Sequence, residues 1–122
     1  MTTLATLVAA VALATAPMPP PGIVDGATAQ QVVAAGAVVI DVRTPAEYQA
    51  GHIPGARLIP FDQIAARAAE LPPRDRPVLL YCRTGRRTGL AAAALAQLGY
   101  TAVYDLQGLS NWRGPVEAGP PR

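Results

Sequence analysis

A single cysteine stands where an apolar run turns into a segment rich in glycine and arginine. Residues 79–81 (LLY) lead to Cys82, the only cysteine of the chain, and residues 83–89 (RTGRRTG) follow it. The stretch from Leu90 to Leu98 is rich in alanine and leucine, so the pattern predicts a strand, a tight loop and a helix. A thiol placed directly before a helix N-terminus is a candidate nucleophile.

The residues after Cys82 favour its reactive form. A cysteine thiol has an ordinary pKa of about 8.5, so little of the reactive thiolate exists at neutral pH. A helix N-terminus, backbone N–H groups freed by a turn, and neighbouring arginines would all favour the anion. The same groups would hold an anionic adduct on the sulfur. The predicted binding residues of this loop are Arg83, Thr84, Gly85, Arg86 and Arg87.

Length and composition limit the remaining classes of function. A chain of 122 residues predicts one domain with a single core, and 13 prolines and 11 glycines predict many turns. The net charge of +2, without a basic stripe carrying interleaved aromatic residues, argues against a nucleic-acid partner. One cysteine cannot form an intramolecular disulfide, and one histidine offers no metal cluster. We therefore expect neither a metal nor a cofactor.

The N-terminal segment differs from the rest of the chain. Residues 4–14 carry no charge and lead to Ala14-Thr15-Ala16, which is typical of a secretory signal peptide with a cleavage site. We interpret residues 1–21 as a signal peptide with a proline-rich linker, and residues 22–119 as the folded domain in the periplasm or outside the cell. The segment lacks an N-terminal basic residue and is too short for a stable membrane span. Two alternatives to a cleaved signal peptide are open. The segment is an uncleaved membrane anchor, or the protein is cytoplasmic and its start codon is mis-assigned.

Strand and helix patterns alternate along the domain. Strands are predicted at residues 23–24, 38–41, 58–59, 78–81 and 101–104. Helices are predicted at residues 29–35 with Thr28 as N-cap, from Thr44 to before Gly51, at 62–70, and at 90–98 with Gly99 as C-cap; a turn or short helix follows at 108–112. This alternation predicts an α/β fold whose parallel sheet is covered on both faces.

Two candidate site residues fall at the same edge of that sheet. Asp41 and Cys82 each end a predicted strand, and ligands of parallel sheets bind beyond the carboxyl ends of the strands. Asp41 and Arg43 are therefore candidate substrate ligands. An internal ion pair between them is the alternative interpretation.

Three segments resemble the rhodanese domain family. Residues 41–56 (DVRTPAEYQAGHIPGA) resemble its entry signature, residues 81–88 (YCRTGRRT) its active-site loop, and residues 104–108 (YDLQG) with Trp112 its closing segment. The family often has two glycines where this chain has Gly108-Leu109, so the backbone near Leu109 is expected to differ. The resemblance covers residues 23–115 and implies a three-layer fold with a central, mainly parallel five-stranded sheet flanked by helices.

The resemblance implies a sulfurtransferase that works without a cofactor. Cys82 would take the outer sulfur of a small anionic donor such as thiosulfate and carry it as a persulfide. It would then pass that sulfur to cyanide or a thiol. The amides of residues 83–87 would cradle the persulfide, and the arginines would attract the anionic donor.

Two other functions remain open. A related phosphatase or arsenate reductase would need an arginine six positions after the cysteine, where this chain has Thr88. A sulfur-carrier module would instead deliver its persulfide to a partner protein.

Structural roles are expected for the remaining polar residues of these segments. His52 is expected to belong to the fold, and Tyr48 and Trp112 are expected to anchor the core or the loops. Thr88 is expected to cap the helix or to hydrogen-bond the loop.

Overall fold

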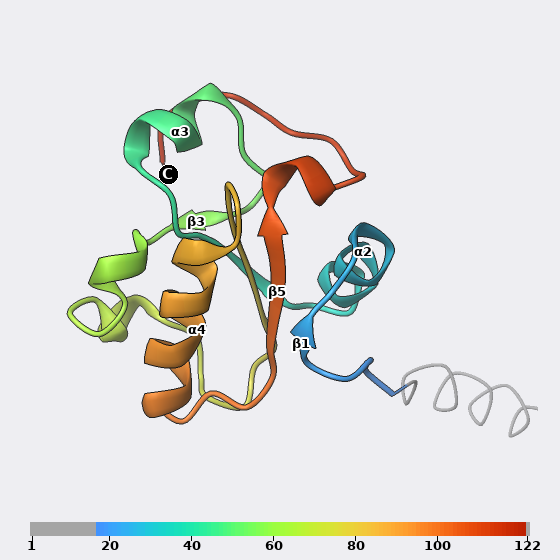
Figure 1. Cartoon of the computed structure of the whole chain (residues 1–122), viewed down its shortest axis with the longest axis vertical. Coiled ribbons are helices and arrows are strands. Elements are labelled where there is room, and N and C mark those ends of the chain that lie inside the picture. The colour runs from blue at the N-terminus through green and yellow to red at the C-terminus, as the bar shows by residue number, and fades with distance from the viewer. Residues whose placement is uncertain (1–16, 122) are drawn as a thin grey trace, which may run out of the picture.

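Residues 17–121 are described by a computed structural model, and they form one five-stranded sheet with all strands parallel (Figure 1). The strand order across the sheet is β1-β5-β4-β2-β3. The strands are β1 (Gly22–Ile23), β2 (Val38–Asp41), β3 (Arg57–Leu58), β4 (Val78–Cys82) and β5 (Val103–Gly108). The predicted α/β fold with a five-stranded sheet is confirmed.

Helices cover both faces of the sheet. α2 (Gly26–Ala34) and α4 (Arg86–Gln97) lie on opposite faces, and the short α3 (Pro45–Ala50) follows β2 (Figure 1). Side chains of α2 and α3 join one apolar cluster with Leu79 and Tyr81, whereas α4 joins a second cluster with Leu80 and Cys82. Alternate side chains of β4 therefore pack on opposite faces of the sheet, and the Cys82 side chain packs on the same face as α4.

The central strand β4 is the most buried element of the fold. All five of its residues are buried, and it lies between β5 and β2. A parallel strand covered on both faces needs apolar side chains in both directions, which explains the unbroken run VLLY before Cys82. The run ends at the carboxyl edge of the sheet, so the cysteine lies where ligands of such sheets bind.

Local capping fixes the short helix α3 as predicted. The Thr44 hydroxyl accepts the Glu47 N–H at 3.2 Å, and the Glu47 carboxylate accepts the Thr44 N–H at the same distance. Pro45 occupies the first turn, and the helix ends before Gly51.

The predicted cap of the first helix is wrong. Asp25, not Thr28, is the N-cap of α2, and its carboxylate accepts the Thr28 N–H at 2.8 Å. A Cβ added to Gly26 would lie 2.2 Å from the carbonyl oxygen of Asn111. The backbone at Gly26 thus packs directly against a distant segment, and the helix begins there, three residues earlier than predicted.

The predicted helix over residues 62–70 is also wrong. Two short 3₁₀ helices replace it, η1 (Phe61–Gln63) and η2 (Ala68–Glu70), and neither has a side-chain cap. Uncapped helices of about nine residues are marginal without packing. Here the segment bends so that Ile64 enters the core and the Arg67 guanidinium donates to the Leu58 carbonyl at 3.2 Å.

Other boundaries also differ from the predictions, and β1 and β3 each begin one residue earlier than expected. β5 begins at Val103 and extends to Gly108, past the predicted end at residue 104, and the 3₁₀ helix η3 (Leu109–Asn111) follows it. α4 begins at Arg86, so the loop after Cys82 has only three residues. The C-cap of α4 is Leu98, and Gly99 follows it with φ +98°.

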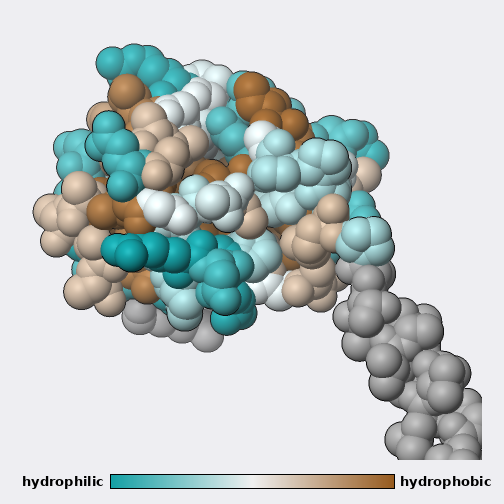
Figure 2. Space-filling view, turned by 90° about the horizontal axis from the view of Figure 1, so that it is seen from below, coloured by the Kyte–Doolittle hydropathy of each residue, from teal (hydrophilic) through white to brown (hydrophobic). Residues whose placement is uncertain are grey.

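The predicted signal peptide lies mostly outside the described residues, which begin at Pro17. The predicted linker is partly attached to the domain, since the Tyr104 hydroxyl donates to the Pro19 carbonyl at 2.7 Å and Gly22 opens β1. Within residues 17–121 no helix has the length and apolarity to cross a bilayer. Figure 2 views the molecule from below, where hydrophilic and hydrophobic residues are interspersed on the surface.

Candidate active site

Cys82 lies at the base of a pocket at the carboxyl edge of the sheet. Its side chain is buried, and the pocket has a volume of about 480 Å³. The residues that line it come from the ends of β2 and β4, from α3 and from η3, and they are Arg43, Glu47, Ala50, Cys82, Arg83, Thr84, Leu109 and Ser110. The sequence pattern did not single out Ala50 and Ser110, because each reaches the pocket only through the fold.

The loop after Cys82 turns back so that a backbone amide meets the sulfur. Gly85 has φ +99°, a left-handed conformation that favours glycine, and it is the N-cap of α4. Its N–H donates to Cys82 Sγ at 3.1 Å. One amide of the loop thus bonds the sulfur directly, and the positive end of α4 faces it.

Thr88 lies on the other side of the sulfur. Its side chain is fully buried in the first turn of α4, and its hydroxyl donates to the Gly85 carbonyl at 2.9 Å. Thr88 Oγ1 also lies 3.8 Å from Cys82 Sγ, within hydrogen-bonding reach of the sulfur. The hydroxyl therefore braces the loop, as predicted, and it also contacts the reactive atom.

The surroundings lower the pKa of the Cys82 thiol. Burial acts against the charged form, but hydrogen bonds from the backbone N–H groups of Gly85, Thr88 and Thr84 and from the Thr88 hydroxyl outweigh it. The groups that bond the sulfur are backbone amides and a hydroxyl rather than arginine side chains. More thiolate is consequently present at neutral pH than in an ordinary cysteine.

The three arginines of the loop lie in different environments. The Arg87 guanidinium forms two bonds to the Glu47 carboxylate, at 2.7 and 3.0 Å, and so joins α4 to α3. Arg83 and Arg86 are exposed, and neither forms an ion pair with a described residue. Arg83 lines the pocket itself. Arg83, at the pocket, and Arg86, at the start of α4, are thus available to an anion, whereas Arg87 is held by the Glu47 carboxylate.

Asp41 and Arg43 are paired with each other inside the protein. Arg43 Nη2 lies 2.7 Å from Asp41 Oδ2, its Nε contacts both carboxylate oxygens, and Nη2 also donates to the Gly51 carbonyl at 2.7 Å. Asp41 is fully buried, and Arg43 is 8% exposed. The ion-pair interpretation is confirmed, and of the two residues Arg43 also lines the pocket.

The closing segment forms the wall opposite α3. A Cβ on Gly108 would lie 2.6 Å from the Arg83 carbonyl oxygen, so β5 passes directly against the loop. Gln107 is the one non-glycine residue with positive φ among residues 17–121 (φ +69°). Leu109 begins η3.

His52 has the structural role that the sequence predicts. Its ring stacks on Tyr48 with centroids 3.7 Å apart, its Nδ1 contacts the Tyr48 carbonyl, and its Nε2 lies 3.3 Å from Glu117 Oε1. This fixes the C-terminal segment against α3, away from the sulfur.

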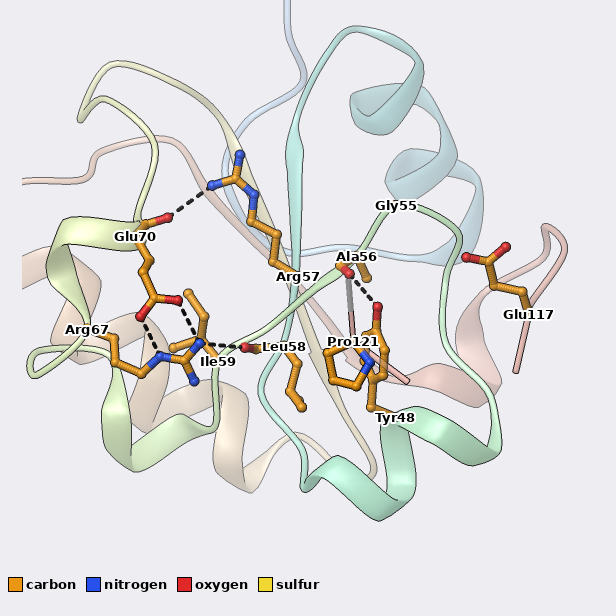
Figure 3. Close-up of a pocket in the computed structure, with 10 residues that line it drawn as sticks. All are labelled: Tyr48, Gly55, Ala56, Arg57, Leu58, Ile59, Arg67, Glu70, Glu117 and Pro121. Atoms are coloured by element: carbon orange, nitrogen blue, oxygen red, sulfur yellow. Dashed lines mark hydrogen bonds and ion pairs between the residues drawn. The ribbon is translucent and has the colours of Figure 1, made fainter. Parts of the chain in front are cut away.

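A second pocket lies beside β3 (Figure 3). Its charged side chains already have partners: Arg67 binds Glu70 through two bonds of 2.7 Å, Arg57 donates to the Glu70 carbonyl, and Glu117 contacts His52. The Tyr48 hydroxyl donates to the Ala56 carbonyl at 2.8 Å. None of the ten residues drawn is a cysteine, serine or threonine, whereas the pocket at the carboxyl edge of the sheet contains Cys82. Within residues 17–121 no three histidine, cysteine or acidic side chains gather as metal ligands.

Comparisons with known proteins agree with this geometry. The model of the rhodanese-like domain matches residues 26–114. The chain is 45% identical over 71 residues to a sulfurtransferase of Allochromatium vinosum, covering 58% of this chain and 65% of that protein. It is 38% identical over 81 residues to the thiosulfate sulfurtransferase PspE of Escherichia coli, covering 66% and 78%.

A solved structure shares the fold. A rhodanese with anions from E. coli superposes with a TM-score of 0.65 at 36% identity, covering 69% of this chain and all of that one. The residues matched by the family model, 26–114, include β2, the Cys82 loop, α4 and β5. With the family model spanning most of the domain, this chain belongs to the rhodanese-like domain family.

Proposed function

We propose that the chain is a sulfurtransferase that carries a sulfane sulfur on Cys82. The thiolate attacks the outer sulfur of a thiosulfate-like donor, the S–S bond of the donor breaks, and sulfite leaves with the electron pair. An acceptor nucleophile, cyanide or a thiolate, then attacks the outer sulfur of the persulfide. The Cys82 thiolate leaves and is regenerated, so no net oxidant or reductant is needed.

The observation that carries this proposal is the bond from the Gly85 N–H to Cys82 Sγ, at 3.1 Å. It stabilises the thiolate, and the neighbouring amides of the loop can also donate to the outer sulfur of a persulfide anion. The relatives named as sulfurtransferases support the same chemistry. A buried sulfur among amide donors suits an anionic adduct better than a neutral one.

An anionic donor is supported by the two unpaired arginines. Arg83 lines the pocket, and Arg86 is exposed at the start of α4, directly after the loop. Thiosulfate is a dianion, and arginine binds oxyanions through paired N–H groups. We assign donor attraction to these side chains, whereas Arg87 holds α3 through Glu47.

Phosphoryl or arsenyl transfer is less well supported. Those reactions need an arginine six positions after the cysteine to hold a tetrahedral oxyanion, and that position holds the buried Thr88 hydroxyl. The neighbouring Arg87 cannot replace it while both of its terminal nitrogens bond Glu47.

The decisive experiment is intact-protein mass spectrometry after incubation with thiosulfate. The wild type should gain the mass of one sulfur atom and release one equivalent of sulfite, whereas Cys82→Ala should do neither. Cys82→Ser should also remain unmodified, which controls for the cavity left by alanine, and circular dichroism should show that both variants are folded. A folded, unmodified wild type that releases no sulfite contradicts the proposal.

The acceptor is tested on the persulfide form. Addition of cyanide or a small thiol should remove the extra sulfur and return the original mass. If the persulfide resists both small acceptors but transfers its sulfur to a thiol-bearing partner protein, the chain acts as a sulfur carrier rather than as an enzyme for small acceptors. Turnover of p-nitrophenyl phosphate without sulfur loading would favour the phosphatase alternative.

A further inference from the structure

The end of β5 contains an extra residue beside the active-site loop. Leu80 pairs with Asp105, but Cys82 pairs with Gly108. One residue of β4 thus lies opposite two residues of β5, Leu106 and Gln107, which is the pattern of a β-bulge. Bulges redirect the side chains next to them, and this one lies directly beside Cys82.

Gln107 has a costly backbone conformation in this bulge. Its φ of +69° lies in the left-handed region, where a Cβ meets the carbonyl oxygen and residues other than glycine lose conformational free energy. The Asp105 carboxylate accepts the Gln107 N–H at 2.8 Å and fixes this conformation. Such a conformation persists only when the surroundings require it, and it is frequent at functional sites.

The surroundings that Gln107 meets are those of the sulfur cradle. A Cβ placed on Gly85 would lie 3.0 Å from Gln107 Nε2 and 3.3 Å from its Cβ and Cγ. The Gln107 side chain therefore lies against Gly85, on the side where another residue would carry its own side chain. Gly85 is the residue whose N–H bonds Cys82 Sγ.

The two flanking contacts leave the loop little freedom. On one side the Thr88 hydroxyl bonds the Gly85 carbonyl at 2.9 Å. On the other side Gly108 packs against the Arg83 carbonyl. The Gln107 side chain packs against Gly85 from a third direction, and it also lines the hollow beside β1 and α2.

We propose that Gln107 is a positioning residue that holds the Gly85 N–H on the Cys82 sulfur. The bulge and the left-handed backbone bring its side chain against Gly85, and this contact keeps the amide directed at the thiolate. The inference rests on the proposed function only in taking Cys82 as the nucleophile. It assigns a role in thiolate activation to a residue that never contacts the sulfur.

The variant Gln107→Gly distinguishes an effect on the reactivity of Cys82 from an effect on the stability of the fold. Glycine adopts a positive φ without cost, so the variant should be at least as stable as the wild type while it loses the side chain that covers Gly85. A loss of reactivity in a protein of equal or greater stability cannot come from unfolding. Gln107→Asn tolerates the same backbone and keeps a shorter amide, so it should restore part of the reactivity.

The test is alkylation of Cys82 by iodoacetamide as a function of pH, with urea unfolding in parallel. Gln107→Gly should shift the pH midpoint upward and slow alkylation at neutral pH by roughly three- to tenfold. Gln30→Ala, which removes an exposed glutamine from α2, should leave the pH midpoint and the alkylation rate unchanged. Alkylation does not depend on sulfur transfer, so this test is informative even if the chain transfers no sulfur.

The outcomes are distinct. A Gln107→Gly protein with greater stability and an unchanged alkylation profile would overturn the proposal. The strained backbone at Gln107 would then have no role in activating the thiolate. A raised midpoint that Gln107→Asn partly restores supports it. A raised midpoint in Gln30→Ala as well would also overturn it, because the effect would then not be specific to Gly85.

Discussion

Arg87 and Glu47, forty residues apart in the chain, form a two-bond ion pair beside the active-site pocket, with N–O distances of 2.7 and 3.0 Å. Glu47 also completes the capping box of α3, and Arg87 lies in the first turn of α4. The pair therefore connects the two helices that flank the pocket. Both side chains are about three-quarters buried, at 21% and 27% exposure.

This pair predicts a specific acid sensitivity. Bonds from Arg87 lower the pKa of Glu47 from 4.5 to about 2. A carboxylate with a depressed pKa in the folded state adds stability above its unfolded pKa and loses it as the pH falls toward the folded value. Urea unfolding between pH 6 and pH 3 should therefore show a shallower loss of stability for Glu47→Gln than for the wild type. Parallel curves for the two proteins would contradict the assignment.

Replacement of Thr88 should impair the thiolate without changing the shape of the site. Thr88→Val keeps the volume but removes the hydroxyl that bonds the Gly85 carbonyl and lies 3.8 Å from the sulfur. We expect alkylation of Cys82 at neutral pH to slow by roughly three- to tenfold, because the Gly85 carbonyl loses its bond and the sulfur loses a neighbouring hydroxyl. Thr101→Val, at an exposed position outside the site, is the control. Equal rates for Thr88→Val and wild type would exclude a role for the hydroxyl.

Two glycines near the loop should respond in opposite directions to alanine. Gly108→Ala would place a Cβ 2.6 Å from a backbone oxygen of Arg83, so it should displace the loop and cost about 1–3 kcal/mol of unfolding free energy. Gly89 lies in α4 with open space around it, so Gly89→Ala should stabilise the protein by about 0.5–1 kcal/mol. Both are measured by urea denaturation. A neutral Gly108→Ala would show that the close approach is not required.

Breaking the buried Asp41–Arg43 pair should lower the free energy of unfolding more than breaking the exposed Arg67–Glu70 pair. Asp41→Asn leaves the Arg43 guanidinium buried without its counter-charge and should cost about 3–5 kcal/mol. Glu70→Gln breaks an exposed pair with Arg67 and should lower the free energy of unfolding far less than Asp41→Asn does. Thermal or urea unfolding compares them directly. Similar losses in the two variants would show that burial does not govern the energetics of these pairs.

The elements that depend on local chemistry could be read from the sequence. The capping box of Thr44 and Glu47, and the apolar run that ends at Cys82, gave the correct positions of α3 and β4. Caps and buried β-runs act over a few residues, so neighbouring positions are enough to specify them. Segments with competing local options were placed incorrectly, as at Thr28, where Asp25 caps α2 instead.

The sequence by itself determined the fold class and pointed to Cys82 as the candidate nucleophile, because strands and helices alternate along the chain and it has a single cysteine. Only the tertiary structure decided how the loop residues are used. It bound Arg87 to Glu47, brought the Thr88 hydroxyl to the sulfur and placed Gln107 against Gly85. These contacts join residues on different elements, and their geometry depends on strand register and on a one-residue bulge that no local pattern encodes.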